Sequence, residues 1–248
     1  MSKLTELVRD HSHLNHDQIT HLNHLVSEWG VLADLSFSDL LLYVPALDGA
    51  WHVVAQVRPA TAQTMYASDW VGTWADPSEV SMLADAYETA EIRSGEVIGE
   101  GVVGETHVTA IPVSFDGRPI AVLTRAWVEQ AGRRPGDLEE AYGSLFERFV
   151  DMIVVGSFPY PHRVGDSSAA PRVGDGVMWL DERGEVTYLS PNANSALHRV
   201  GIQASPIGMR LAELGFLDGP VRQAFERRVP VIEEFEQGID VTLLCRCI

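Results

Sequence analysis

The sequence predicts an α+β protein of two domains, each an antiparallel sheet with flanking helices. Residues 108–115 and 119–126 show the clearest hairpin pattern, two strand-like segments around a short turn. Long segments with apolar residues three and four apart predict helices. Residues 156–174 mix Gly, Pro, Ser and Asp without a period, which is typical of a linker. We therefore expect domains at 1–155 and 175–248.

Composition limits the function. With 248 residues, the chain is long enough for two hydrophobic cores. Its formal net charge of −17 disfavours binding to a phosphate backbone or an anionic bilayer, and no apolar segment approaches the length of a membrane span. Cys245 and Cys247 share one strand face without the geometry of an ordinary disulfide. These features predict a cytoplasmic protein with no nucleic-acid or membrane partner.

The first domain is expected to open with a polar segment at residues 1–16. A helix is predicted over 17–35, then strands at 40–44 and 51–58 and a short helix at 79–87. Opposite the apolar stripe of the first helix we expect three polar residues, His21, His24 and Glu28. The hairpin turns at Asp116-Gly117-Arg118. Asp137 and Glu140 predict a capping box at the start of a last helix, 137–155.

The second domain opens with a strand at 177–180 and a turn ending at Gly184. A second strand follows, and Ser190 then serves as an N-cap with Pro191 in the first helical turn. Glycine at position 201 ends that helix. A helix at 220–228 and a hairpin of strands 231–236 and 239–247 complete the expected elements.

These signals resemble two sensory folds. The order Asp175-Gly176, Asp181, Gly184 and Ser190-Pro-Asn-Ala193 resembles the start of a PAS domain. The preceding order of helix, strands, helices, hairpin and helix, with 111–123 as central strand pair, resembles a GAF domain. Its opening, Glu28-Trp29 and residues 32–39, is similar to the N-terminal GAF domain of actinobacterial cytosolic sensor histidine kinases of the PdtaS type. Both folds imply a five- or six-stranded antiparallel sheet with helices on one side.

The resemblance implies the sensory region of a two-component histidine kinase, which would control autophosphorylation of a kinase domain beyond Ile248. ATP and magnesium would belong to that domain, a response regulator would be its partner, and this region would hold no cofactor. Helices 17–35 and 137–155 would form a homodimer. Two alternatives stay open. The same tandem could serve a cyclic-dinucleotide cyclase, a phosphodiesterase or a phosphatase, or the string Gly99–Gly104 could belong to an autonomous oxidoreductase.

A small sensory ligand of unknown identity could bind in the cup of either domain. The candidate cup-lining residues are His52, Trp70, His107, Trp179, Tyr188 and Asn192. Trp179 and Tyr188 flank a turn, so strand alternation decides which of the two points into an apolar cup too small for haem. No catalytic constellation is recognised.

The N-terminal histidines are the remaining candidates for a metal site, because imidazole suits zinc, copper and nickel. They are His11, His13, His16, His21 and His24. Polar residues opposite an apolar stripe are the normal pattern of a helix, so we expect a solvated face and no metal.

The predicted second domain is one strand short. Four strands are counted where a PAS sheet has five, with the fifth between the first and the fourth. We therefore expect strands 177–180 and 239–247 not to pair with each other, and the fifth strand to be encoded after Ile248.

Overall fold

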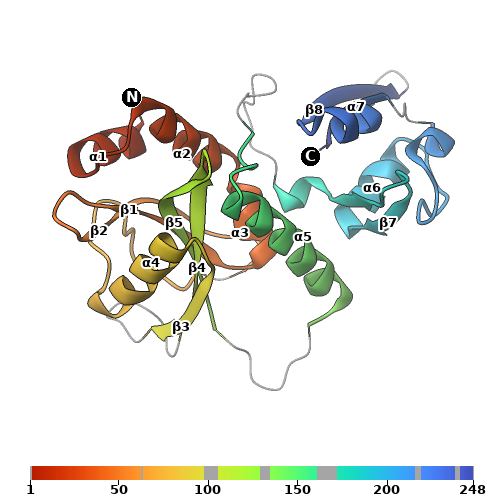
Figure 1. The fold of residues 1–248 in the computed structure, drawn as a ribbon. Helices are drawn as coiled ribbons and strands as arrows, with labels where there is room; N and C mark the ends of the chain where they lie inside the picture. Colours follow the sequence, from red (N-terminus) through yellow and green to blue (C-terminus); the bar gives the residue numbers. More distant parts are fainter. Residues whose placement is uncertain are drawn as a thin grey trace. The chain divides into compact units, whose positions relative to one another are not determined.

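The structure is a computed structural model that describes residues 2–62, 64–97, 106–128, 135–160, 172–215, 219–237 and 241–247. The chain separates into two compact units, Met1–Pro161 and His162–Ile248 (Figure 1). The division falls inside the predicted linker 156–174, and the predicted domain limits stay a prediction.

The described part of the N-terminal unit contains a five-stranded antiparallel sheet in the order β2-β1-β5-β4-β3. The strands are β1 (Asp39–Pro45), β2 (Trp51–Val57), β3 (Arg93–Val97), β4 (Thr106–Phe115) and β5 (Arg118–Trp127). The helices are α1 (Lys3–His11), α2 (His16–Glu28), α3 (Gly30–Ser36), α4 (Pro77–Thr89) and α5 (Asp137–Val154). The predicted strands at 40–44 and 51–58, the helix at 79–87 and the long last helix are confirmed.

The hairpin prediction is confirmed together with its turn. Asp116 and Gly117 both have positive φ, 51° and 73°. Two successive left-handed residues are the requirement of the two-residue hairpin turn whose twist matches that of the flanking strands. This turn positions β4 and β5, the long strands at the middle of the sheet.

Helices cover both faces of this sheet, so the expectation of helices on one side is wrong for the N-terminal unit. Val108 of β4 and Ala126 of β5 pack with Leu83 of α4. Arg125, the neighbour of Ala126, instead places its guanidinium carbon 5.2 Å from the ring centre of Phe146 in α5. In Figure 1, α4 and α5 accordingly lie on opposite sides of β4 and β5. A strand that is apolar at every position, such as 40–44, needs cover on both faces.

The predicted helix 17–35 is two helices. α2 ends at Glu28, and α3 begins at Gly30 after the C-cap residue Trp29. Every residue of α3 is buried. Because the apolar spacing continues across the junction, the periodicity alone could not reveal the break, although glycine is a poor helix former.

Three local features differ from expectation or were missed. The segment 1–16 contains α1, whose Leu4 and Val8 are buried one turn apart. β3 was not predicted because it is a short edge strand with few apolar residues. At the start of α5 the Glu139 carboxylate accepts from the Gly136 N–H at 2.9 Å, so the predicted box of Asp137 and Glu140 is wrong by one residue.

The C-terminal unit contains two separate antiparallel ladders in the part of the chain described, β6–β7 and β8–β9. Its elements are the 3₁₀ turns Val173–Asp175 and Leu211–Leu214, the helices α6 (Pro191–Arg199) and α7 (Gly219–Arg227), and the strands β6 (Met178–Leu180), β7 (Val186–Leu189), β8 (Val231–Gln237) and β9 (Val241–Cys247). Within the described residues β6 and β9 do not pair, as the strand count predicts.

Ser190 connects the start of this unit to α6, as the N-cap prediction requires. Its buried hydroxyl accepts from the N–H of Ala193 at 3.2 Å and from the N–H of Val177 at 2.9 Å. Gly176 (φ 109°) lies so close that a Cβ there would be 2.7 Å from the Ala193 nitrogen. Glycine is therefore required for the chain to approach the helix at this point.

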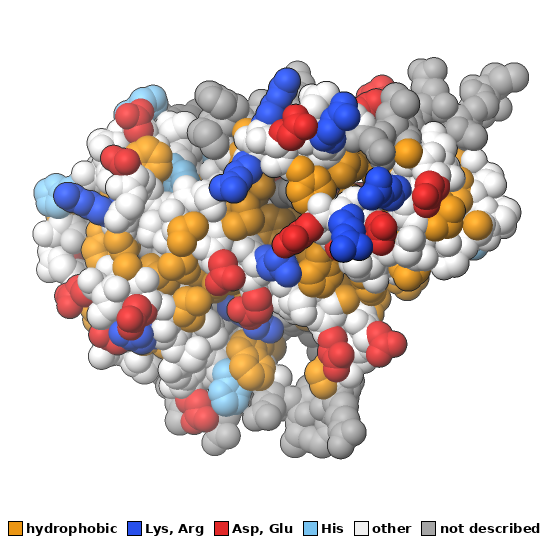
Figure 2. All heavy atoms as spheres, turned by 45° about the vertical axis from the view of Figure 1, so that its right-hand side comes forward, with side chains coloured by type: hydrophobic (Ala, Val, Ile, Leu, Met, Phe, Trp, Pro, Cys, Tyr) orange, Lys and Arg blue, Asp and Glu red, His pale blue; other side chains and the backbone are white. Residues whose placement is uncertain are grey.

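Two surface observations complete the fold. On the face shown in Figure 2, acidic and basic side chains are interspersed, with hydrophobic side chains between them. Among the helices of the described residues, none is both long and apolar enough to cross a membrane.

Candidate functional site

A buried group of acids and phenols lies under α4, and we call it the α4-face cluster: Tyr43, Tyr66, Glu79 and Asp39. The Tyr43 hydroxyl donates to Oε2 of Glu79 at 2.9 Å, and Glu79 is only 3% exposed. Asp76 caps α4 by accepting from the Ser78 N–H at 2.9 Å. Glu79 therefore sits in the first turn, on the same helix face as the buried Leu83 four residues later.

Burial controls the protonation of the cluster. It raises the pKa of Glu79, against the hydrogen bond from Tyr43, which lowers it. Burial also raises the pKa of Tyr43 and of Tyr66, and the nearby Glu79 adds to both shifts. A carboxyl with a raised pKa keeps its proton to a higher pH and can then donate a hydrogen bond.

Buried carboxylates also hold the segment that follows β2 over the sheet. Asp39 accepts from the Thr64 hydroxyl at 2.7 Å and from the Met65 N–H, and Asp34 accepts from the Ala60 N–H at 2.7 Å. The segment thereby carries Tyr66 into the cluster. Carboxyl and phenol groups can donate and accept hydrogen bonds, so the cluster is suited to recognising polar groups of a small molecule.

The three predicted cup residues of the N-terminal unit lie in different places. Trp70 packs at the α4 face and its ring centre is 5.5 Å from that of Tyr66. His52 lies on the other face of β2, stacked on His11. His107, next to the α4-facing Val108, stacks on Trp127 with ring centres 4.7 Å apart. The structure thus brings only Trp70 into the α4-face cluster.

Sequence reasoning missed the other members of that cluster. A signal existed for Glu79, because an acid at the core-facing position of the predicted helix 79–87 is uncommon and usually has a partner. The partner, Tyr43, lies 36 residues away on β1, a distance that no local pattern reports.

The expectation of an exposed His21 is wrong. Its ring packs at 5.1 Å from that of Phe115, because α2 covers the end of β4, and the residue is 7% exposed. Burial, with a smaller effect of His24, lowers the pKa of His21 to about 4. No group of three or more His, Cys, Asp or Glu residues that could hold a metal occurs in the described ranges. The string Gly99–Gly104 lies outside those ranges, but the element after it is the strand β4.

In the C-terminal unit Trp179 and Tyr188 are directly opposite each other on β6 and β7. Opposite residues share a sheet face, so the expectation that alternation would separate the two rings is wrong. The neighbouring pair, Met178 and Leu189, packs against Leu197 of α6. Both aromatic rings therefore belong to the face away from that contact.

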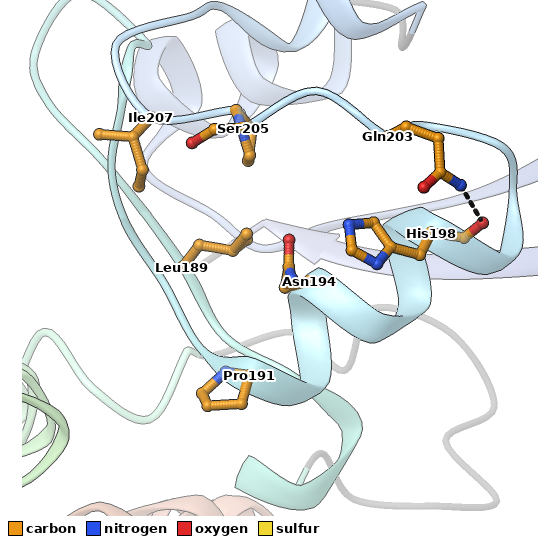
Figure 3. Close-up of a pocket in the computed structure, with 8 residues that line it drawn as sticks. Leu189, Pro191, Asn194, His198, Gln203, Ser205 and Ile207 are labelled. Carbon is orange, nitrogen blue, oxygen red and sulfur yellow. Dashed lines mark hydrogen bonds between the residues drawn. The ribbon is translucent and has the colours of Figure 1, made fainter.

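Asn192 has a local structural contact. Its side-chain amide donates to the Gly174 carbonyl at 3.1 Å and ties the first turn of α6 to the preceding 3₁₀ turn. No predicted residue lines the open depression of about 510 Å³ beside α6. Its lining residues are Leu189, Pro191, Asn194, His198, Gln203, Ser205, Pro206 and Ile207. Figure 3 shows Asn194 and His198 directed from α6 toward the 203–207 loop.

Comparisons with known proteins agree with the fold. The family model described as "Histidine kinase PdtaS, GAF domain" matches residues 4–145. The chain is 37% identical over 217 residues to the sensor histidine kinase PdtaS of Mycolicibacterium smegmatis, covering 86% of this chain and 44% of that protein. It is 39% identical over 223 residues to PdtaS of Mycobacterium tuberculosis H37Rv, covering 86% of this chain and 43% of that protein.

A solved structure extends the likeness over both units. It is described as the sensor region of a sensor histidine kinase, with a TM-score of 0.82 and 33% identity over 99% of this chain and 91% of that chain. The chain spans less than half of the length of the curated relatives it matches. Since the family model covers more than half of the chain, the protein belongs to the PdtaS family of histidine kinases, and residues 4–145 are its GAF domain.

Proposed function

We propose that this chain is the sensory region of a two-component histidine kinase and controls the autophosphorylation of a kinase domain in the full-length protein. The observation that carries the proposal is the TM-score of 0.82 over 99% of the chain to a kinase sensor region. In this proposal the kinase domain uses ATP and magnesium, a response regulator receives the phosphoryl group, and the protein works in the cytoplasm.

The C-terminal unit is proposed to be a PAS domain. Support comes from the hairpin β6–β7, which leads directly into the Ser190 cap and α6. The close approach of Gly176 to Ala193 explains why a glycine follows Asp175 in the Asp-Gly pair. The ladder β8–β9 would join β6 through a strand supplied by further chain.

The α4-face cluster is the proposed sensory input. Its buried carboxyl and phenol groups could exchange their mutual hydrogen bond for bonds to a small ligand, with Trp70 beside them. Such binding would shift a population between two arrangements of the domain rather than create a new one.

A homodimer is the proposed route of transmission, and α5 supports it. The buried side of this helix comprises Tyr142, Phe146, Val150 and Ile153. A second apolar stripe, Leu138, Leu145 and Met152, is only half-buried and repeats every seven residues. That period is typical of helices that pair along their length, so a second copy is the proposed occupant of the stripe.

The full-length protein tests this proposal. We expect the double substitution Leu145→Glu and Met152→Glu to lower the dimer fraction in light scattering and to reduce autophosphorylation with labelled ATP several-fold. The control is Ser144→Glu, which adds one negative charge, half of that in the double variant, at an exposed position of α5. Unchanged autophosphorylation in the double variant, or no phosphohistidine in the wild type, would contradict the proposal.

A further inference from the structure

His11, at the C-terminal end of α1, contacts the β1–β2 hairpin through both its backbone and its side chain. Its backbone carbonyl accepts from the Leu47 N–H at 2.9 Å. Its imidazole stacks on that of His52 in β2, with ring centres 4.2 Å apart and planes 26° apart. Trp74 meets both rings edge-on, at 5.7 Å from His11 and 4.7 Å from His52.

This cluster combines burial with access to solvent. His52 is 2% exposed, whereas Trp74 is 48% exposed. Nδ1 of His52 has no hydrogen-bond partner among the described residues. A proton can therefore reach the cluster past an exposed ring, and an imidazolium at His52 would lose the hydration that stabilises its charge.

The surroundings favour neutral rings. Burial lowers the pKa of His52 and the neighbouring His11 lowers it further, while the Gly72 backbone opposes the shift. Among the described residues, His11 is the titratable group whose charge, when it is protonated, lowers the pKa of His52. β1 places Val44 opposite His52, and the segment before α4 contributes the Trp74 ring. Two stacked imidazolium ions would repel each other with little screening.

We propose that His11 and His52 form a proton-operated latch, which holds the end of α1 on β2 while both rings are neutral and releases it when they are protonated. Because the docked pKa is lowered below 6.5, the docking free energy is fully present above pH 6.5 and is lost as the pH falls below it. Release is local, since the start of α1 stays attached through Ser2, whose hydroxyl donates to Asn23 Oδ1 at 2.7 Å.

The latch goes beyond the proposed function and does not depend on which output domain the full-length protein carries. Its test uses the 248-residue chain alone, so its failure would leave the kinase proposal untouched.

The first measurement is an NMR titration of the histidine ring C–H signals between pH 5 and 8. We expect the pKa of His52 to lie below the ordinary histidine value of 6.5, and His11→Phe to raise it. The matched control is His13→Gln, two residues beyond the latch, which should leave His52 unchanged. A His52 titration that His11→Phe does not move would overturn the latch.

The second measurement is hydrogen exchange of the α1 amides at pH 7.5 and 5.5, corrected for intrinsic exchange rates, with α5 as internal reference. Protection at residues 8–11 should fall about tenfold for each unit by which release raises the pKa of His52. His11→Phe keeps a stacking ring that cannot be protonated, so its α1 should lose less protection between pH 7.5 and 5.5 than α1 of the wild type. Equal losses of protection in this variant and the wild type, or poor protection of the variant at both pH values, would overturn the latch.

Discussion

The two faces of the N-terminal sheet differ in the ionisable groups that they bury. The α4 face holds the acids Glu79 and Asp39. The other face and its helices hold the bases Arg125, between α3 and α5, and His52, under α1, with Asp34 of α3 as a buried acid on the same side. Each buried acid accepts hydrogen bonds, whereas the buried imidazoles of His21 and His52 pack against other rings and burial lowers their pKa values. We therefore expect the two faces to respond to pH in opposite directions.

Arg125 shows how a permanent charge fits among these groups. Its guanidinium donates to the Ser36 carbonyl at 3.2 Å and to the Ser38 hydroxyl at 3.2 Å. Burial lowers its pKa, and Glu147 raises it in part. The carbonyl it binds lies at the end of α3, where the helix dipole is negative, so this carbonyl helps to compensate the buried charge.

Among the substitutions that test the two faces, Phe146→Ala should cause the largest loss in the free energy of unfolding. Phe146 is fully buried and lies under the Arg125 guanidinium, so its removal leaves a cavity beside a buried charge. We expect a loss of about 3–5 kcal/mol in the free energy of unfolding, measured by urea dependence of hydrogen exchange in β4. Phe225→Ala, at a ring that is half exposed in the C-terminal unit, is the control and should leave β4 unaffected.

Tyr43→Phe tests how much the hydrogen bond to the buried Glu79 on the α4 face contributes to stability. The variant removes the hydroxyl that donates to Oε2 of the buried Glu79 at 2.9 Å. Leaving a buried acceptor unsatisfied costs about 1–3 kcal/mol, and chemical denaturation at pH 6 should show that loss.

Glu79 on the α4 face should also make the free energy of unfolding depend on pH. Because the folded pKa of Glu79 is raised, its contribution is fully present below the unfolded pKa and is lost as the pH rises through the folded pKa. Glu79→Gln should therefore flatten the decline of stability toward alkaline pH. Glu88→Gln, at an exposed acid of the same helix, serves as the control. Equal slopes for both variants and the wild type would show that Glu79 ionises freely in the fold.

His21→Gln tests the opposite pH response, a loss of stability as the pH falls. The folded pKa of about 4 lies below the ordinary histidine value of 6.5, so the neutral ring contributes stability above pH 6.5 that is lost as the pH falls toward 4. The wild type should lose on the order of 2 kcal/mol over that interval through this residue. Thermal unfolding of the variant between pH 7 and 4.5 should show a flatter curve, and an unchanged slope would contradict the assignment.

Sequence reasoning recovered the parts of this fold whose signals are local. The hairpin turn at Asp116-Gly117, the Ser190 cap and the apolar stripe of α5 are each specified within a few residues. The α2–α3 break at Trp29 was missed because apolar spacing continues through it. The candidate sites were predicted less well, because each depends on a contact between residues far apart in the sequence. Glu79 contacts Tyr43, 36 residues away, and His52 contacts His11, 41 residues away.

The smallest expected effect concerns an imidazole that reaches the surface. Nδ1 of His107 lies 4.0 Å from Oε1 of Glu96 on the neighbouring strand β3, and the Glu96 side chain is 65% exposed. Exposed pairs of this kind contribute little because water and salt screen them. Glu96→Gln should change the free energy of unfolding by less than about 0.5 kcal/mol at pH 6. If urea denaturation showed that Glu96→Gln lowers the free energy of unfolding as much as Tyr43→Phe does, burial could not explain why the interior groups contribute more to stability than the surface pair.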